Sequence, residues 1–329
     1  MEVIENGIGT LFTDPDPDHA REFFRGKSRK MVNKLMSVKE AVEKFTHDGD
    51  YLAIGGFGAN RIPTAVCHEL LRQGRKNMGF AGHTATHDFQ ILVAGKVFNR
   101  LDASYVVGLE ARGLSPNARK YMQSGEVNTT EWSNYGLAAR FRAAAMGVSF
   151  LPVRTTLGTE TYQYGAVKKI LCPFTGEPYM AVPALYPDVA AIHVHAADVY
   201  GNCRIRGITI ADLDIARAAK RLIITTERII SNDDIRKEPI RTVIPYYLVD
   251  AVCEVPYGSY PGNMAYEYFS DEEHLQEWMR MEKDPEAFKA FLDKNIYNCE
   301  SHFDYLRVNG GMERMLDLRQ KELFFLTKG

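Results

Sequence analysis

Apolar and polar positions along this chain follow two spacings, one typical of strands and the other of helices. Short apolar runs such as Tyr51–Gly56 and Leu222–Thr225 predict buried strands. Apolar residues three or four positions apart, beginning at Val38, predict an amphipathic helix. Ser37 and Glu40 form a capping box at the start of that helix. The chain therefore alternates between the two kinds of element.

The predicted strands are Tyr51–Gly56, Met78–Ala81, Tyr105–Gly108, Ala190–His195, Leu222–Thr225 and Val249–Val255. The predicted helices are Pro63–Gln73, His87–Ala94, Asn117–Gln123, Asn134–Met146, Ala211–Ala219, Asp271–Met281 and Pro285–Lys294. This order predicts an α/β fold with an open, mostly parallel, doubly wound sheet. We expect an irregular N-terminal arm over residues 1–30, the α/β domain over 31–265, and a helical extension over 266–329 packed on the same domain.

Composition narrows the class of protein further. Of the 329 residues, 45% are hydrophobic and 25% charged, which is typical of a soluble globular protein with a large core. The net charge of −2 provides no overall field that would attract nucleic acid or an anionic membrane. The five cysteines are scattered and form no C-x-x-C pair, so we expect reduced thiols and a cytoplasmic location. No apolar run reaches the roughly 20 residues of a membrane span.

A glycine-rich loop is the first candidate for chemistry. Gly55-Gly56-Phe57-Gly58-Ala59 follows a predicted strand and precedes a helix that begins near Pro63. Glycine lets the main chain approach a ligand closely, and open α/β sheets bind ligands at the carboxyl ends of their strands. We expect unpaired N–H groups of this loop to face a ligand. A dinucleotide fingerprint is a poor match, because Arg61 stands where its third glycine belongs. A tight turn without a ligand role is the remaining alternative.

A second loop follows the next strand. Gly82, His83 and Thr84 should lie beside the glycine loop and line a substrate pocket. His83 and His87 could share a helix face, and His193 and His195 share a strand face, which would suit a metal ion. No H-E-x-x-H spacing accompanies them, so we expect no metal site and read His193 as a core residue.

The glycine loop also resembles a signature of the class I coenzyme A transferases. Asp48-Gly49, Leu52-Ala53-Ile54, Gly55-Gly56-Phe57 and Pro63 fall at the matching spacing, and Arg61 replaces a glycine, as in the glutaconate CoA-transferase branch. Three further stretches are similar to the α subunits of that branch, and the resemblance covers about residues 36–325. They are Gly136–Val148, Asp198–Asn202 and Asp212–Lys220.

This resemblance implies transfer of coenzyme A between carboxylic acids through a glutamyl-CoA thioester on the enzyme. Backbone N–H groups of Gly56–Ala59 would stabilise the oxyanions that form on the way. The family's nucleophilic glutamate lies in a Ser-Glu-Asn-Gly segment of a β subunit, and here only Ile4-Glu5-Asn6-Gly7 imitates it, with no strand before it. We therefore expect no catalytic residue in this chain, a partner β subunit in an α/β hetero-oligomer, and no cofactor besides the acyl-CoA substrate itself.

Three questions stay open at this level. Arg61 could pair with the carboxylate of a dicarboxylic substrate such as glutaconate, or with an acidic residue of the partner. Relatives of the branch include ring-opening CoA-ester hydrolases and a decarboxylase; the hydrolases use an acidic residue at the head of the long helix, where this chain has Asn134. A non-catalytic module that binds CoA esters is the third alternative. The sequence does not identify the acyl group, the acceptor acid or the stoichiometry of the oligomer.

Overall fold

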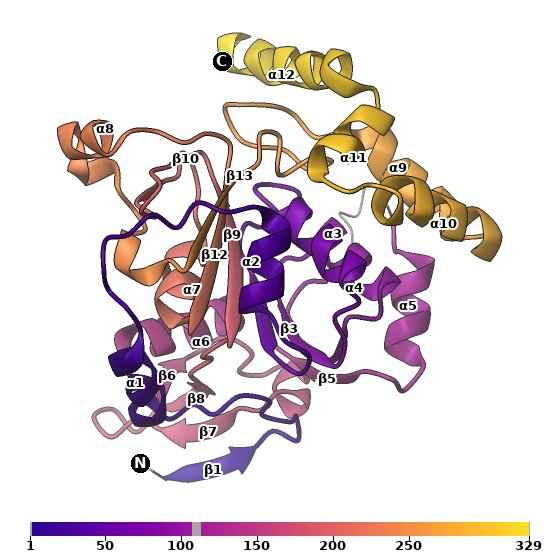
Figure 1. Ribbon diagram of the computed structural model, residues 1–329. Coiled ribbons are helices and arrows are strands. Elements are labelled where there is room, and N and C mark those ends of the chain that lie inside the picture. The colour runs from indigo at the N-terminus through magenta and orange to yellow at the C-terminus, as the bar shows by residue number, and fades with distance from the viewer. Residues whose placement is uncertain (1, 107–112, 329) are drawn as a thin grey trace.

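The computed structural model describes residues 2–106 and 113–328, and its centre is a parallel sheet of seven strands (Figure 1). Their order across the sheet is β13-β12-β9-β2-β3-β4-β5, and every neighbouring pair is parallel. The strands are β2 (Tyr51–Ile54), β3 (Met78–Gly82), β4 (Phe98–Ala103), β5 (Asn128–Glu131), β9 (Val189–Val194), β12 (Arg221–Thr226) and β13 (Ala251–Glu254). The predicted α/β fold is confirmed.

Both faces of this sheet are covered, which explains why its central strands β2 and β9 are apolar almost throughout. Along β2, Leu52 and Ile54 pack into one hydrophobic cluster, and Tyr51 and Ala53 pack into the other. The first cluster contains α2 (Val38–Phe45), α3 (Thr64–Arg72), α4 (His87–Ala94) and α5 (Pro116–Gln123). The second contains α6 (Asn134–Met146) and α7 (Asp212–Ala218). The sheet is therefore doubly wound, as predicted, and the capping box of Ser37 and Glu40 is present at the start of α2.

The strand order reverses next to β2. From β2 the chain proceeds through β3, β4 and β5 on one side, and β9, β12 and β13 occupy the other side. Crevices outside the carboxyl ends of strands at such a switch point are the usual ligand sites of open α/β sheets. The loop after β2 is the predicted glycine loop, so it lies at this switch point.

The sequence patterns missed a second sheet, which is antiparallel and has the order β1-β7-β8-β6. Its strands are β1 (Val3–Asn6), β6 (Phe150–Val153), β7 (Lys168–Leu171) and β8 (Pro178–Pro183). The prediction of an irregular arm over residues 1–30 is wrong, because β1 pairs with β7 and α1 (Pro17–Gly26) is a regular helix. A strand of four exposed residues has little periodicity of its own, and its pairing partner lies far along the chain.

The predicted strand Tyr105–Gly108 is also wrong where the structure describes it, since Tyr105 and Val106 lie outside any strand and the rest lies outside the described residues. The strand of this region is β4, whose pairing with β3 and β5 outweighs its polar Asn99 and Arg100. A short hairpin, β10 (Ala196–Ala197) with β11 (Cys203–Arg204), and the helix α8 (Asn232–Lys237) complete the α/β part of the chain.

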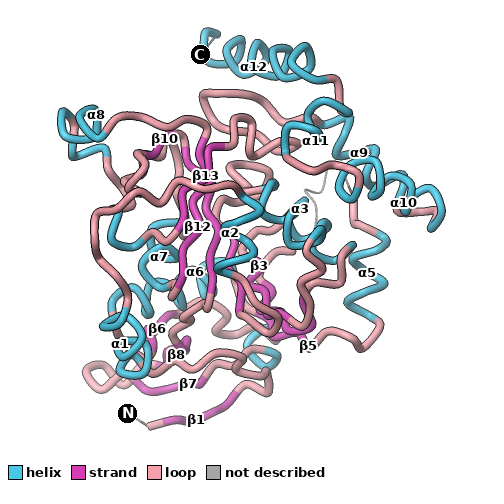
Figure 2. The backbone as a smooth tube through the Cα atoms, in the orientation of Figure 1, coloured by secondary structure: helices cyan, strands magenta, loops and turns pink. Residues whose placement is uncertain are grey.

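The C-terminal part is helical (Figure 2) and contains α9 (Glu272–Met281), α10 (Pro285–Leu292) with the π-helical segment Asp293–Tyr297 after it, α11 (His302–Val308) and α12 (Gly311–Lys328). Trp278 of α9 and Phe291 of α10 join the hydrophobic cluster of α2 to α5, so these two helices share a core with the sheet, whereas Tyr305 of α11 and Met315 of α12 pack in a separate cluster. The boundaries proposed between the three parts of the chain stay a prediction. Among the described residues, no helix combines the length and the apolar character needed to cross a membrane.

Candidate functional site

The glycine loop leaves β2 in a conformation that requires its glycines. Gly56 has φ of +82°, and a Cβ there would lie 2.5 Å from the carbonyl oxygen of Asn60. Gly58 has φ of +57°. Both values lie in the left-handed region that favours glycine. The loop returns on itself through hydrogen bonds between Phe57 and Asn60, and the helix α3 then begins after Pro63.

Most N–H groups of the loop already have acceptors within the chain. The N–H of Gly55 donates to Ala191 O, that of Phe57 to Asn60 O, and that of Gly58 to Thr84 O, at 2.8 to 3.1 Å. The expectation that the N–H groups of Gly56–Ala59 are unpaired is therefore wrong for three of the four residues, because Gly56 is engaged as well. Among the described residues, the Ala59 N–H has no acceptor, and it remains the loop's free donor.

Asp212, the first residue of α7, fastens the loop to the opposite side of the switch point. Its Oδ1 accepts the Gly56 N–H at 2.7 Å, and its Oδ2 pairs with Arg61 Nη2 at 2.9 Å. Both side chains of the ion pair are fully buried. Gly55 makes room for this carboxylate, because a Cβ on Gly55 would lie 2.6 Å from Asp212 Oδ1. Asp212 is thus a positioning residue for the loop.

Arg61 meets a carboxylate, as expected, but the carboxylate belongs to this chain and not to a substrate or a partner. Besides Asp212, its Nη2 donates to Ile208 O at 2.6 Å. Its backbone N–H donates to Asn263 O at 2.9 Å. Because the side chain is 0% exposed, no substrate carboxylate reaches it in this conformation. The prediction that Arg61 binds substrate directly is corrected by this burial.

The loop that contains Gly258 and Asn263 packs against the glycine loop. Asn263 N–H donates to Ala59 O at 2.8 Å, and a Cβ on Gly262 would lie 2.1 Å from that same oxygen. The N–H of Thr64 donates to Gly258 O at 3.1 Å, so the first turn of α3 is capped by this loop. The glycine loop is therefore clamped on both sides and held rigid.

The predicted second loop lies beside the first. Thr84 O accepts the Gly58 N–H at 2.8 Å, and Thr86 Oγ1 donates to Gly58 O at 2.6 Å. Gly82 allows close packing, since a Cβ there would lie 2.3 Å from Val106 Cγ1. Burial lowers the pKa of His83, so its ring is neutral at pH 7. The predicted neighbourhood of Gly82, His83 and Thr84 is confirmed, and their contact with substrate stays a prediction.

His193 of β9 and His195, which follows the end of that strand, belong to separate hydrogen-bond networks. His193 bonds Thr225 at 2.8 Å and Glu227 Oε1 at 2.7 Å, fully buried. His195 bonds Ala265 O at 2.8 Å, and burial lowers its pKa to about 4. In the described part of the chain, no cluster of three or more His, Cys, Asp or Glu residues could hold a metal ion.

The carboxylates along this edge of the sheet already have partners. Burial opposes the charged form of Glu227, but hydrogen bonds from His193, Tyr268 and the Tyr257 N–H outweigh it and lower its pKa. Asp88 accepts the Thr86 N–H at 2.7 Å, and burial raises its pKa to about 6. Asp212 is engaged as well, so each of these three carboxylates has partners within the chain.

Glu5 lies at the other end of the molecule. It belongs to β1, at the bottom of Figure 1, whereas α8, which follows the carboxyl end of β12, lies near the top. Its carboxylate bonds Tyr162 at 2.6 Å and Lys169 at 3.0 Å. The likeness of Ile4–Gly7 to the family's glutamate motif therefore has no counterpart at the glycine loop.

Comparison with known proteins agrees with this fold. The family model described as coenzyme A transferase matches residues 35–255, and the chain belongs to that family. It is 32% identical to the A subunit of glutaconate CoA-transferase of Acidaminococcus fermentans over 88% of this chain and 95% of that one. It is 35% identical to the A subunit of 3-oxoadipate CoA-transferase of Pseudomonas knackmussii, over 83% and 96%.

A solved structure gives the same result. The crystal structure of glutaconate coenzyme A-transferase from Acidaminococcus fermentans superposes with a TM-score of 0.83 at 32% identity, covering 87% of this chain and 95% of that chain. The prediction of a CoA-transferase chain of the α-subunit type is confirmed. Sequence reasoning found the loop but missed Asp212 as its anchor, although the motif that begins at Asp212 is one of those that carry the family resemblance.

Proposed function

We propose that this chain is the α subunit of a two-subunit CoA-transferase, which moves coenzyme A from an acyl-CoA to a carboxylic acid. The arrangement at the switch point is the observation that supports this proposal most directly. The switch point presents a rigid loop with a free N–H donor at Ala59, while Asp212, Glu227 and Asp88 beside it are all engaged. The loop donor would stabilise an oxyanion, and we propose that a β-subunit glutamate supplies the nucleophile.

The reaction then follows from the chemistry of thioesters. The glutamate attacks the carbonyl carbon of the acyl-CoA, and the carbonyl oxygen becomes an oxyanion that the Ala59 N–H stabilises. The CoA thiolate leaves, giving an acyl–glutamyl anhydride. Attack of this thiolate on the glutamyl carbonyl releases the first carboxylic acid and leaves a glutamyl-CoA thioester. The acceptor carboxylate reverses these steps and departs as the new acyl-CoA.

The chain's own residues serve to hold the loop in place. Asp212 and Asn263 fix it from opposite sides, so the donor needs no reorganisation when charge develops. We infer that Arg61 influences substrate choice only indirectly, through the loop that it helps to hold. A dicarboxylic, glutaconate-like acyl group is the substrate class we propose, because the similar A subunits belong to glutaconate and 3-oxoadipate CoA-transferases; the CoA thioester is the substrate and no separate cofactor is needed. The five free cysteines favour a cytoplasmic location.

The test compares this chain alone, the chain with its β partner, and the partner alone. We expect CoA transfer from an acyl-CoA to acetate only when both chains are present. Full transfer by this chain alone would refute the proposal. A CoA ester that gains one water while its thioester stays intact would favour the related ring-opening hydrolases, and release of carbon dioxide with a CoA ester one carbon shorter would favour the decarboxylase. Binding of CoA esters without any turnover by the complex would favour the non-catalytic alternative.

A further inference from the structure

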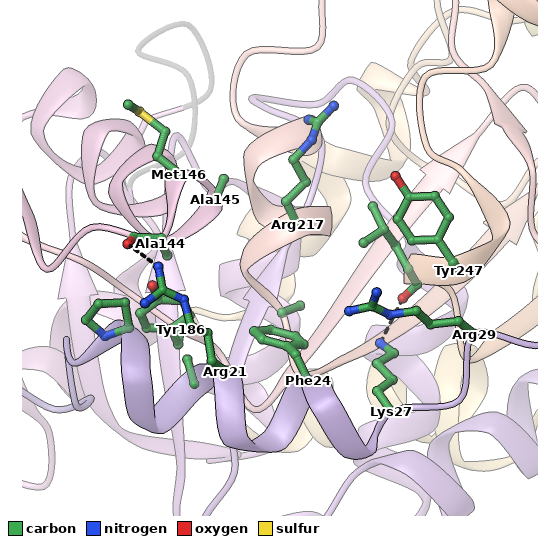
Figure 3. Close-up of a pocket in the computed structure, with 15 residues that line it drawn as sticks. Arg21, Phe24, Lys27, Arg29, Ala144, Ala145, Met146, Tyr186, Arg217 and Tyr247 are labelled. Atoms are coloured by element: carbon green, nitrogen blue, oxygen red, sulfur yellow. Dashed lines mark hydrogen bonds between the residues drawn. The ribbon is translucent and has the colours of Figure 1, made fainter.

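A cavity of about 370 Å³ lies between α1 and the C-terminal ends of α6 and α7 (Figure 3). We call it the arm pocket. Its lining comes from α1 and the loop after it, from the ends of the two helices, and from Tyr186, Tyr247 and Leu248. The C-terminal end of α7 is at the amino-terminal edge of the sheet, since Ala219 lies two residues before β12. The arm pocket is therefore separate from the glycine loop, which follows the carboxyl end of β2.

The charged residues that line the arm pocket are all cations: Arg21, Lys27, Arg29 and Arg217. Two of them are neutralised nearby, because Lys27 pairs with Asp250 at 2.7 Å and Arg21 with Asp18 at 2.6 Å. Arg29 and Arg217 have no carboxylate partner within residues 2–106 and 113–328. The pocket therefore has an uncompensated positive charge, although the whole chain has a net charge of −2.

Arginines near helix C-termini often donate hydrogen bonds to carbonyl groups there, and two arginines of the pocket each make one bond to a carbonyl oxygen. Arg21 Nη2 donates to Gly147 O at 3.2 Å, and Arg217 Nη1 donates to Leu213 O at 2.8 Å. A guanidinium has five N–H donors, so each of these bonds uses a small share of the total. Most donors of the two arginines, and all those of Arg29, stay available to a ligand.

A second observation comes from Tyr186. Its side chain lines the pocket next to Arg21 in Figure 3, and the residue is 5% exposed. Its hydroxyl is buried and has no hydrogen-bond partner among the described residues. Buried hydroxyls nearly always have a partner, so this one indicates a group that the pocket receives. Phe24, Tyr247 and Ala219 supply apolar surface in the same cavity.

We propose that the arm pocket binds a nucleoside phosphate. Arginine guanidinium groups match phosphate oxygens in geometry and charge, and the apolar and aromatic lining suits a base or sugar. The volume falls within the usual range of small-molecule sites, roughly 300–1,000 Å³. The ligand would connect α1 to α6 and α7, which gives the N-terminal arm a binding role. This site does not depend on the proposed transferase reaction.

Calorimetric titration of the full chain with ADP at low ionic strength tests the proposal. We expect a dissociation constant on the order of 0.1 mM or tighter. The double variant R29A/R217A should weaken binding about tenfold or more, and Y186F, which removes one hydroxyl, about threefold to tenfold. Arg25→Ala is the matched control, because Arg25 is an exposed cation of α1 outside the pocket lining. It should bind ADP as the wild type does.

Three results would overturn the proposal. Absence of ADP binding by the wild-type chain would do so directly. Equal ADP affinity in R29A/R217A and the wild type would place any bound ADP elsewhere, for example at the glycine loop. Binding of pyrophosphate as tightly as ADP would show that the apolar lining adds nothing to the affinity and that the pocket does not recognise the nucleoside. A circular dichroism spectrum of each variant that matches the wild type confirms that the variants fold.

Discussion

The ion pair between Arg61 and Asp212 predicts that the variant Asp212→Asn loses both stability and activity. The carboxylate serves two partners at once, the Gly56 N–H through Oδ1 and Arg61 through Oδ2. An asparagine in the same place has one oxygen and one NH₂ group, so it can satisfy only one of these donors. If its oxygen stays on Gly56, the NH₂ group faces Arg61 as a second donor, and the buried guanidinium loses its counter-charge.

The size of the loss follows from burial. Both side chains are 0% exposed, and removing one partner of a buried ion pair typically costs about 3–5 kcal/mol. Arg61 keeps its bond to Ile208 O, which places the expected loss at the lower end, about 3 kcal/mol in the free energy of unfolding. In the complex with the β partner, a shifted loop should lower kcat by about 100-fold, with a smaller change in KM.

Urea unfolding followed by circular dichroism measures the first effect, and CoA-transfer kinetics of the complex measure the second. Asp214→Asn is the matched control, because Asp214 is on the same helix and pairs with a largely exposed Arg142 at 3.2 Å. An exposed pair of this kind contributes about 0–1 kcal/mol. The reasoning is refuted if Asp212→Asn is as stable as Asp214→Asn, or if it lowers stability while kcat stays at the wild-type value.

Three other substitutions test separate parts of the account. Gly55→Ala should lower the free energy of unfolding by about 1–3 kcal/mol and reduce kcat, because its Cβ would meet Asp212 Oδ1 at 2.6 Å. Gly26→Ala is the control, because Gly26 has open space around it and no positive φ, and it should leave kcat unchanged; equal kcat values in the two variants would contradict this. Asp88 has a folded-state pKa of about 6, above its unfolded value near 3.9. Burial of its carboxyl group therefore does not lower the free energy of unfolding below about pH 4, where the group is protonated, and lowers it by the full amount above about pH 6, where the group is charged. Asp88→Asn should therefore be more stable than the wild type by about 2 kcal/mol at pH 8 and equally stable near pH 4 in urea unfolding, and a pH-independent difference would count against that pKa. Ser37→Ala should lose about 1 kcal/mol in thermal unfolding through the capping box of α2, and an unchanged melting temperature would show that the cap contributes nothing.

The core of the fold could be predicted from the sequence because its signals are local. The apolar run of β12 and the capping box of α2 each lie within a few consecutive residues. The second sheet could not be predicted in the same way. β1 has four exposed residues and pairs with β7, more than 150 residues later, so only tertiary pairing makes it a strand. β4 shows the same effect, since its neighbours in the sheet outweigh its polar residues.

The candidate site likewise has a part with local sequence signals, which could be predicted, and a part formed by tertiary contacts, which could not. The glycines at positions 55, 56 and 58 were recognisable, because positive φ and close approach restrict those positions to glycine. The acceptors that occupy most of the loop's N–H groups were not recognisable. Asp212 lies 156 residues from Gly56 along the chain, and no spacing rule connects the two. The burial of Arg61 was missed for the same reason, since its partner is brought to it only by the fold.

Trapping the covalent intermediate tests the central claim most directly. The complex of this chain with its β partner is incubated with an acyl-CoA, treated with borohydride, and both chains are mapped by mass spectrometry. Borohydride reduces a glutamyl-CoA thioester to the alcohol, which marks the glutamate that carried it. The account predicts one reduced glutamate, in the β chain, and none in residues 1–329 of this chain. A reduced glutamate in this chain would contradict the account.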